Sequence, residues 1–262
     1  MPQFLEYPVK NRDDFEKIKS LYKPDYSLRL YNNWIGITEN YRKNGYKIWL
    51  YNDLWGFFGV LRQLMGVELL SVMFYDDPIF IHKILSFYTD YTVNFWGYIL
   101  NRLKVDIVMI WEDMAYKNGS LISPKMFKEF LLPYYKKLTR FLKDWNVDKI
   151  FVDSDGNVNE LIPLWIEAGI DGIYPMEVMA GMNIVKIRKS FPELIIAGGI
   201  DKHALAKDQN EIDKELEKAD YVLRTGRYIP FVDHSIPSNV SWENFRYYRE
   251  KLNNIIDKSL KT

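Results

Sequence analysis

The feature that most constrains the fold is an alternation of short apolar runs with longer amphipathic segments in the second half of the chain. The apolar runs lie within VDIVMIWEDM, VDKIFVDSDG, IDGIYPMEV, ELIIAGGID and RYIPFVDHS. Apolar strands separated by helices are typical of a parallel sheet that helices cover, as an open doubly wound sheet or a closed barrel. No GxGxxG or GxxxxGK[ST] motif follows these strands, which disfavours the nucleotide-binding open sheet. The pattern therefore favours a (β/α)8 barrel.

The helix boundaries and the number of strands complete this prediction. Ser123-Pro124 and Ser241 are typical residues for helix N-termini. Five apolar runs and KIWLYND near Lys47 fall short of the eight strands of a complete barrel. Either SLRLY near Ser27 and another N-terminal run supply the rest, or the chain lacks the front of the barrel. We predict a single barrel domain over residues 1–262, with an irregular segment at 1–45 and the barrel at 46–262.

Composition limits the classes of partner. The 262 residues are 48% hydrophobic and can bury a large core, while the formal net charge is zero and no basic stripe is present, so nucleic acid is not expected as a partner. The absence of cysteine excludes disulfides, thiolate metal sites and cysteine nucleophiles. The charged N-terminus and the lack of an eighteen-residue apolar run predict a cytoplasmic protein without a membrane partner.

Acidic residues collect where the predicted strands end. Such residues are Glu112, Asp113, Asp153, Asp155, Glu177, Asp201 and Asp233, and His234 follows the last of them. In a (β/α)8 barrel the carboxyl ends of the strands meet at one mouth, where catalysis takes place. Asp153 and Asp155 share a strand face by alternation and can converge. Alternatively, these two residues cap the next helix or form an Asx turn before Gly156.

Other polar and aromatic residues are candidates for the same mouth. Tyr174 can donate a hydrogen bond to a developing oxyanion, although a half-buried tyrosine with a solvated hydroxyl is an equally good interpretation. Asn52 ends the strand near Lys47, and Trp55 beside it can form a wall facing a cofactor. Asp201, in GGID, can hydrogen-bond a ligand.

Longer stretches carry a resemblance to a known family. IWEDMAYKNGSLISPKMFKEFLLPYYKKL, VDSDGN, IPLWIEAGIDGIYPMEV, IAGGIDK and PFVDHSIPSNVSWENFRYY occur in this order from about Lys47 to the C-terminus. This order and spacing resemble the uroporphyrinogen decarboxylase superfamily, which includes corrinoid methyltransferases. The resemblance implies a distorted (β/α)8 barrel.

The methyltransferase branch of that superfamily implies a metal site. Its zinc is held by a His-x-Cys-Gly motif and a later Cys, and the resemblance places Asp153, Asp155 and His234 at these three positions. The changed ligand set suits a hard divalent metal such as zinc, manganese, iron or magnesium, with Glu112 or Glu177 completing it. In this interpretation the metal activates the group that accepts a methyl group.

The decarboxylase branch implies a different chemistry. His234 lies at the position of a histidine in that branch, which needs no metal, and His234 or an aspartate would supply the proton that replaces CO2. However, a mouth lined with carboxylates would repel a substrate that carries eight of them, and the N-terminal arginines of that branch are not found.

The sequence predicts an enzyme that moves a methyl group between a small substrate and a corrinoid, with a corrinoid protein as partner and a divalent metal as cofactor. His234, Asp155, Glu112 and Tyr174 are the predicted catalytic residues, the predicted metal ligands are Asp153, Asp155, His234 and Glu177, and Asn52, Trp55 and Asp201 are predicted to bind the cofactor. The alternatives are a decarboxylase of a porphyrinogen or other carboxylated substrate, without cofactor, and a non-catalytic barrel that binds a tetrapyrrole or a partner chain. An incomplete barrel would expose a strand edge, so we also expect a homodimer.

Overall fold

A computed structural model of the chain describes residues 5–23 and 26–260, without the side chains of residues 27–28 and 52–54. The chain divides into two compact units. Unit 1 comprises Met1–Glu112, Ser123–Ile150 and Glu167–Ile170, and unit 2 comprises Asp113–Ile122, Phe151–Ile166 and Asp171–Thr262. The prediction of a single domain stays a prediction.

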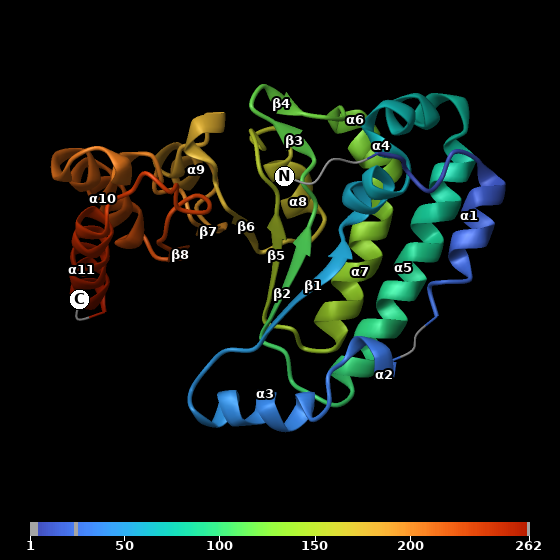
Figure 1. The fold of residues 1–262 in the computed structure, drawn as a ribbon, viewed down its shortest axis with the longest axis horizontal. Coiled ribbons are helices and arrows are strands. Elements are labelled where there is room, and N and C mark those ends of the chain that lie inside the picture. The colour runs from blue at the N-terminus through green and yellow to red at the C-terminus, as the bar shows by residue number, and fades with distance from the viewer. Residues whose placement is uncertain (1–4, 24–25, 261–262) are drawn as a thin grey trace. The chain divides into compact units, whose positions relative to one another are not determined.

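Unit 1 is mostly helical and contains two parallel strands. Its strands are β1 (Trp49–Trp55) and β2 (Ile107–Trp111), paired in parallel with Trp49 opposite Ile107. Its helices are α1 (Arg12–Lys19), α2 (Tyr26–Arg29), α3 (Trp34–Lys43), α4 (Phe57–Asp76), α5 (Pro78–Leu100), α6 (Pro124–Met126) and α7 (Leu132–Asp144). α5 packs against both α4 and α7, and Figure 1 shows these long helices beside β1 and β2.

A helix cap and a proline separate the two long helices α4 and α5. Asp77 accepts the backbone N–H of Phe80, and Pro78 occupies the first turn of α5, where its missing N–H is not needed. Within the part of the chain that the structure describes, α4 is one helix whose length and composition would allow it to cross a membrane, and 56% of its apolar window is buried. Buried core helices have the same apolar character.

Unit 2 contains the regular part of the βα alternation. Its parallel strands are β5 (Lys149–Asp153, which begins in unit 1), β6 (Gly172–Tyr174), β7 (Ile195–Ala197) and β8 (Tyr228–Ile229), in that order. A short antiparallel hairpin joins β3 (Ala115–Tyr116) to β4 (Gly119–Ser120). The helices are α8 (Ile162–Glu167), α9 (Ile184–Ser190), α10 (Gln209–Leu223) and α11 (Trp242–Ser259), with 3-10 turns at Val178–Ala180 and Ala204–Ala206.

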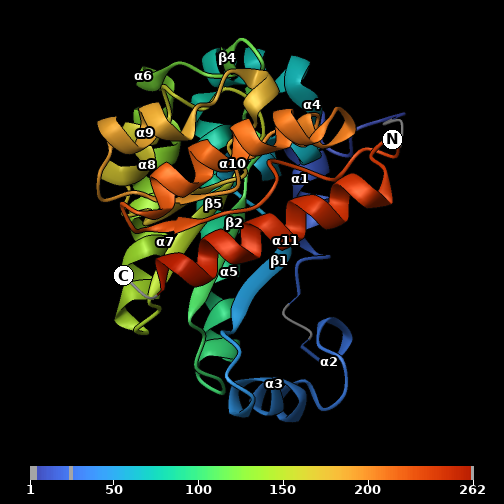
Figure 2. The same cartoon turned by 90° about the vertical axis from the view of Figure 1, so that its left-hand side faces the viewer.

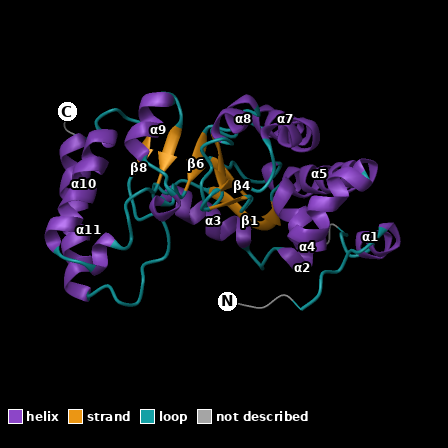
Figure 3. Cartoon of the chain, turned by 90° about the horizontal axis from the view of Figure 1, so that it is seen from above, coloured by secondary structure: helices purple, strands orange, loops and turns teal. Residues whose placement is uncertain are grey.

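In unit 2, α11 begins at the cap that the sequence predicts, and α10 packs against β8. Ser241 accepts the backbone N–H of Asn244 at the start of α11, as Ser123 accepts that of Met126 in unit 1. α10 packs against α9, β8 and α11, and Figures 2 and 3 show α10 beside α11.

The fold confirms the predicted parallel α/β architecture of the (β/α)8 type and corrects one detail. SLRLY near Ser27, offered as a strand, falls instead on α2 and the bend after it, so that run adds no strand. A π-helical turn at Phe127–Leu131 directly precedes α7, whose first turn contains Pro133. Among the described residues the main sheet contains six strands, fewer than the eight of a complete barrel.

Candidate functional site

The predicted site residues fall into both units. Glu112, Asn52 and Trp55 belong to unit 1, whereas Asp153, Asp155, Tyr174, Glu177, Asp201 and His234 belong to unit 2. Their convergence on one mouth stays a prediction. Asn52 lies in β1, but its side chain is outside the described part of the structure.

Glu112 follows β2 and is fully buried in unit 1. Its Oε1 accepts the backbone N–H of Phe57 at 2.8 Å, its Oε2 accepts that of Gly59 at 2.8 Å, and the Tyr135 hydroxyl also donates to Oε1. Burial raises the pKa of Glu112 to about 7, although these donors oppose the shift. Glu112 therefore occupies the N-terminus of α4, where amide donors lack helical partners.

Gly56 leaves room for this carboxylate. Gly56 is the residue before α4 and offers no side chain to cap the helix. A Cβ atom at this position would overlap the Glu112 carboxyl group. The Glu112 carboxylate, predicted to be catalytic, thus caps helix α4, and the amides that it accepts lie 55 and 53 residues away in the sequence. The position of acids after strands does not reveal this structural role.

Trp55 is packed in unit 1. Its ring stacks on that of Trp111 with 4.1 Å between centroids, and the Arg62 guanidinium lies 5.5 Å from the Trp55 centroid. Its backbone carbonyl accepts the Tyr88 hydroxyl at 2.5 Å. One face of the indole is therefore covered by a neighbouring aromatic ring, and a cofactor-facing role for Trp55 stays a prediction.

In unit 2, Asp155 and His234 form the central pair. His234 Nε2 lies 3.5 Å from Asp155 Oδ2, and the two side chains are 45% and 41% exposed, so a small molecule in solvent can reach both. Asp113 Oδ1 lies 3.5 Å from the Asp155 backbone nitrogen. Burial, reinforced by the Asp113 carboxylate and opposed by His234, raises the pKa of Asp155 to about 6.

Asp153 and Asp155 differ in environment. β5 ends at Asp153, which is buried, whereas Asp155 lies two residues further on in the loop and is half-buried. Strand alternation does not extend to Asp155, so that argument for their convergence fails. Asp153 nevertheless stands opposite Tyr174 in the β5–β6 register.

Tyr174 is the aromatic residue of this group. It is half-buried, and its ring lies 5.5 Å from that of Phe231. Burial raises the pKa of Tyr174, and the carboxylates of Asp153, Asp155 and Asp233 raise it further. The phenol is thus kept protonated, and three carboxylates lie within electrostatic range of it.

Glu177 and Asp233 hold backbone amides of the neighbouring loops. Glu177 Oε2 accepts the N–H of Gly156 at 3.0 Å, and Asp233 Oδ2 accepts that of Val178 at 2.8 Å. Lys202, which the sequence analysis did not single out, reaches both acids with Nζ 3.8 Å from Glu177 Oε1 and 3.7 Å from Asp233 Oδ1. The signal in the sequence that could have identified Lys202 is its position directly after the acid of GGID.

Asp201 lies beside this group and shapes a turn. Its Oδ1 accepts the His203 backbone N–H at 2.8 Å, and its own N–H donates to Glu215 Oε2 at 3.2 Å. These contacts anchor the start of the segment that leads into α10. A ligand-binding role for Asp201 stays a prediction.

The predicted metal ligands do not assemble into a metal centre. Among residues 5–23 and 26–260, no group of three or more His, Asp and Glu side chains has an arrangement that could hold a metal ion. Asp155 and His234 are adjacent, but Glu177 is held by Gly156 and faces the Lys202 ammonium. The predicted set of Asp153, Asp155, Glu177 and His234 therefore does not fit a divalent metal, and no step below uses one.

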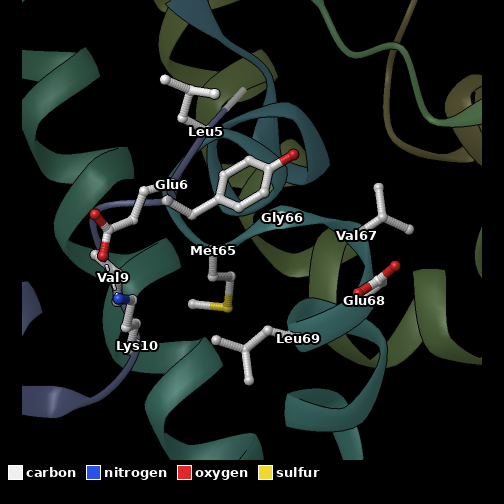
Figure 4. Close-up of a pocket in the computed structure, with 10 residues that line it drawn as sticks. Leu5, Glu6, Val9, Lys10, Met65, Gly66, Val67, Glu68 and Leu69 are labelled. Atoms are coloured by element: carbon white, nitrogen blue, oxygen red, sulfur yellow. Dashed lines mark hydrogen bonds and ion pairs between the residues drawn. The ribbon is translucent and has the colours of Figure 1, made fainter. Parts of the chain in front are cut away.

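A cavity of about 640 Å³ lies elsewhere, within unit 1 (Figure 4). Residues 5–7, 9–10 and 65–69 line it, and Figure 4 shows Glu6 and Lys10 pointing toward each other. None of the predicted site residues lines this cavity. The candidate site is therefore the group around Asp155 and His234 in unit 2.

A parallel α/β fold of the (β/α)8 type, with polar side chains gathered after its strands, defines the class of this protein. The chain belongs to the uroporphyrinogen decarboxylase family, because the family model "Uroporphyrinogen decarboxylase (URO-D)" matches residues 1–254. This result confirms the resemblance found in the sequence.

Two relatives are methyltransferases. The chain is 22% identical over 204 residues to the methylcobamide:CoM methyltransferase MtbA of Methanosarcina acetivorans, covering 78% of this chain and 57% of that protein. A solved structure of a methyltransferase from Methanosarcina mazei matches with a TM-score of 0.62 and 18% identity, covering 82% of this chain and 61% of that one. The latter similarity concerns the fold alone. The chain spans about three-fifths of the length of these relatives.

Proposed function

We propose that this protein is a methyltransferase that moves a methyl group between a corrinoid and a small substrate. The family membership and the similarity to MtbA, whose name states a methylcobamide as methyl donor, support this class of reaction. The observation that carries the proposal is the Asp155–His234 pair, because methyl transfer to an X–H group requires a group that takes the proton.

The pair has suitable properties for that proton transfer. The carboxylate and the imidazole lie 3.5 Å apart, close enough to interact electrostatically, and both side chains are partly exposed to an incoming substrate. A carboxyl group with its pKa at about 6 is ionised at neutral pH and remains a stronger base than an ordinary aspartate.

The reaction balances as follows. The methyl group leaves the methyl-corrinoid substrate and bonds to the acceptor atom X, while the electron pair of the broken bond stays with the corrinoid. The proton of X–H passes to the Asp155–His234 pair and then to solvent. In the opposite direction the same pair returns the proton to X as the methyl group departs. Tyr174, with its raised pKa, serves as a hydrogen-bond donor to the substrate.

The same proposal includes the partner, the substrate position and the location of the reaction. The corrinoid is carried by a partner protein or is free, the small substrate binds beside Asp155, and the protein acts in the cytoplasm as a homodimer. Asp201, in the same unit as Asp155 and His234, would contribute to corrinoid binding, while roles of Asn52 and Trp55 of unit 1 in cofactor binding stay predictions. A thiol is the acceptor class to test first, because the name of MtbA includes the thiol cofactor CoM.

The test is a methyl-transfer assay with purified protein. Methylcobalamin is incubated with the chain and either coenzyme M or other small thiols, and the loss of methylcobalamin is followed by absorbance while the methylated thiol is detected by mass spectrometry. We expect turnover that Asp155→Asn and His234→Gln remove. His203→Gln, at an exposed histidine of unit 2, is the matched control and keeps the parent rate.

Decarboxylation is the second candidate, and the family description favours it. In that reaction the Asp155–His234 pair would donate the proton that replaces CO2. The excess of carboxylates around the pair opposes binding of a polyanionic porphyrinogen. CO2 release from uroporphyrinogen without any methyl transfer would replace the first proposal by this one, and neither activity would favour the non-catalytic barrel.

A further inference from the structure

Lys202 is a cation enclosed by acids in unit 2. Its side chain is only 12% exposed, and its Nζ lies 3.7 Å from Oδ1 of Asp233, whose side chain is fully buried. The same Nζ lies 3.8 Å from Oε1 of Glu177, which is 26% exposed. A fully buried carboxylate is costly unless a cation and hydrogen bonds compensate its charge, and Lys202 supplies that cation.

The two acids that face Lys202 also hold the backbone. Asp233 accepts the N–H groups of Val178 at 2.8 Å and of Lys202 itself at 3.1 Å, one on each carboxylate oxygen. Glu177 accepts the N–H of Gly156 at 3.0 Å on the oxygen that does not face the ammonium. The segments that follow β5, β6, β7 and β8 are therefore joined by one network of charge-assisted hydrogen bonds.

The network ends next to both members of the candidate pair. Gly156, held by Glu177, directly follows Asp155, and Asp233, held by two backbone amides and Lys202, directly precedes His234. Gly156 has a φ of +88°, and an added Cβ would come within 2.6 Å of the Ala115 carbonyl, so its position is fixed by the hairpin as well. The 3.5 Å separation of Asp155 and His234 thus depends on loops that Lys202 joins.

The oxygens that a divalent metal would need are already engaged. Zinc and similar ions bind oxygen and nitrogen ligands at about 2.0–2.2 Å and take three or more protein groups. Here Glu177 and Asp233 accept backbone amides and face the Lys202 ammonium, which already compensates their charge, whereas Asp155 and His234 face each other. We infer that Lys202 is a positioning residue that takes the place of a metal ion in this chain, holding the loops that carry Asp155 and His234.

The activity part of this inference rests on the proposed function, whereas its structural part does not. The first experiment is elemental analysis of protein purified without chelator, combined with thermal unfolding in the presence and absence of EDTA. We expect no stoichiometric divalent metal and an unchanged Tm. Stoichiometric metal in the parent, removed by EDTA with a fall in Tm, would overturn the inference.

The second experiment compares lysine variants in unit 2. Lys202→Met removes the charge and keeps the length, and Lys202→Arg keeps the charge. Lys207→Met is the control, because Lys207 is 59% exposed, against 12% for Lys202, and its pair with Glu211 lies at the surface. We expect Lys202→Met to lower the Tm by several degrees, Lys202→Arg to restore most of it, and Lys207→Met to leave it within a degree.

A divalent cation separates a charge role from a packing role. Millimolar Mn²⁺ should raise the Tm of Lys202→Met, since it can occupy the vacated position between Glu177 and Asp233, and should leave the parent unchanged. Equal Tm values for Lys202→Met and Lys207→Met, or a parent that Mn²⁺ stabilises, would overturn the inference. If Lys202→Met does not fold, the inference is still tested by three measurements: the metal content of the parent, its response to EDTA, and the Tm of Lys202→Arg.

The methyl-transfer assay adds the functional arm. Lys202→Met should lower kcat about tenfold or more, and Lys202→Arg should recover most of the rate, because the charge rather than the chain length positions the pair. A parent without methyl transfer but with the expected Tm series would reject the proposed function and leave the role of Lys202 intact. Full activity in Lys202→Met would reject the positioning role while the proposed function stands.

Discussion

Two acids that follow strands, Glu112 after β2 in unit 1 and Asp155 after β5 in unit 2, have opposite surroundings. Glu112 is fully buried and accepts the amides of Phe57 and Gly59, while Asp155 is 41% exposed and faces the His234 imidazole at 3.5 Å. Both have raised pKa values, about 7 and about 6. A carboxyl group with a raised pKa after a strand is therefore not sufficient to indicate catalysis. A carboxyl group can exchange a proton with the substrate only if the substrate can reach it.

The largest expected difference between the two acids is in activity. Asp155→Asn and His234→Gln should each lower kcat of methyl transfer by about 10²–10⁴-fold, the usual contribution of a positioned acid or base. Their free energies of unfolding should change by less than about 1 kcal/mol, since exposed ion pairs contribute little. Steady-state kinetics and urea unfolding on the same preparations measure both. Retention of the parent rate in both variants would remove the pair from the mechanism.

Glu112→Gln should instead change stability. At pH 5 the amide leaves one of the buried donors around it without an acceptor, which should lower the free energy of unfolding by about 1–3 kcal/mol. Glu167→Gln is the control, because Glu167 pairs with Lys128 and Lys136 at the surface and should change stability by less than about 0.5 kcal/mol. The kcat of folded Glu112→Gln should match the parent.

The pH dependence of stability tests the same carboxyl group. The pKa of Glu112 is raised from 4.5 to about 7 in the folded protein, so the folded state binds this proton more tightly than the unfolded state does. The contribution of Glu112 to stability is therefore greatest below pH 4.5. This contribution falls as pH rises to about 7, by about 3 kcal/mol at about 1.4 kcal/mol per pKa unit. The gap between the parent and Glu112→Gln should therefore narrow between pH 5 and pH 8. A constant gap across that range would contradict the buried, protonated carboxyl group.

The raised pKa of Asp155 predicts a pH profile of activity rather than of stability. The ionised carboxylate is the base, so the rate of methyl transfer to an X–H acceptor should rise with pH to a plateau, with a midpoint near pH 6. Below the midpoint the rate should fall about tenfold per pH unit. An unperturbed aspartate would place the midpoint near pH 4, and that result would separate the pair from the proton transfer.

These contrasts show what the sequence can and cannot predict. The alternation of apolar runs and amphipathic helices predicted β1, β2, β5, β6, β7 and β8, because strand and helix periodicities are local. It failed at SLRLY near Ser27, where a short run with the same composition forms α2. The helix caps at Ser123 and Ser241 were predictable for the same local reason.

The site was harder to predict because its contacts are long-range. Nothing around Glu112 in the sequence indicates that Gly56 leaves its helix uncapped, or that Tyr135 donates to the carboxylate. Lys202 is adjacent to an acid in the sequence, yet its partners are Glu177 and Asp233 on other loops. The resemblance placed Asp155 and His234 together, but the loop network formed by Glu177, Asp233 and Lys202 required coordinates.

Tyr135→Phe should have the smallest of these effects and isolates one donor to Glu112. The variant removes a hydroxyl from a fully buried ring and should lower the free energy of unfolding by about 1 kcal/mol. The Tyr135 hydroxyl lowers the pKa of Glu112 against the effect of burial, so loss of the hydroxyl should raise this pKa. The pH range over which stability falls should then extend above pH 7. Tyr134→Phe is the matched control from the same helix, because the Tyr134 hydroxyl donates to the His82 carbonyl at 3.0 Å and belongs to a different contact. Urea unfolding from pH 5 to pH 9 measures both variants. An identical window in the two would mean that the hydroxyl does not act on the Glu112 proton, and that burial alone separates Glu112 from Asp155.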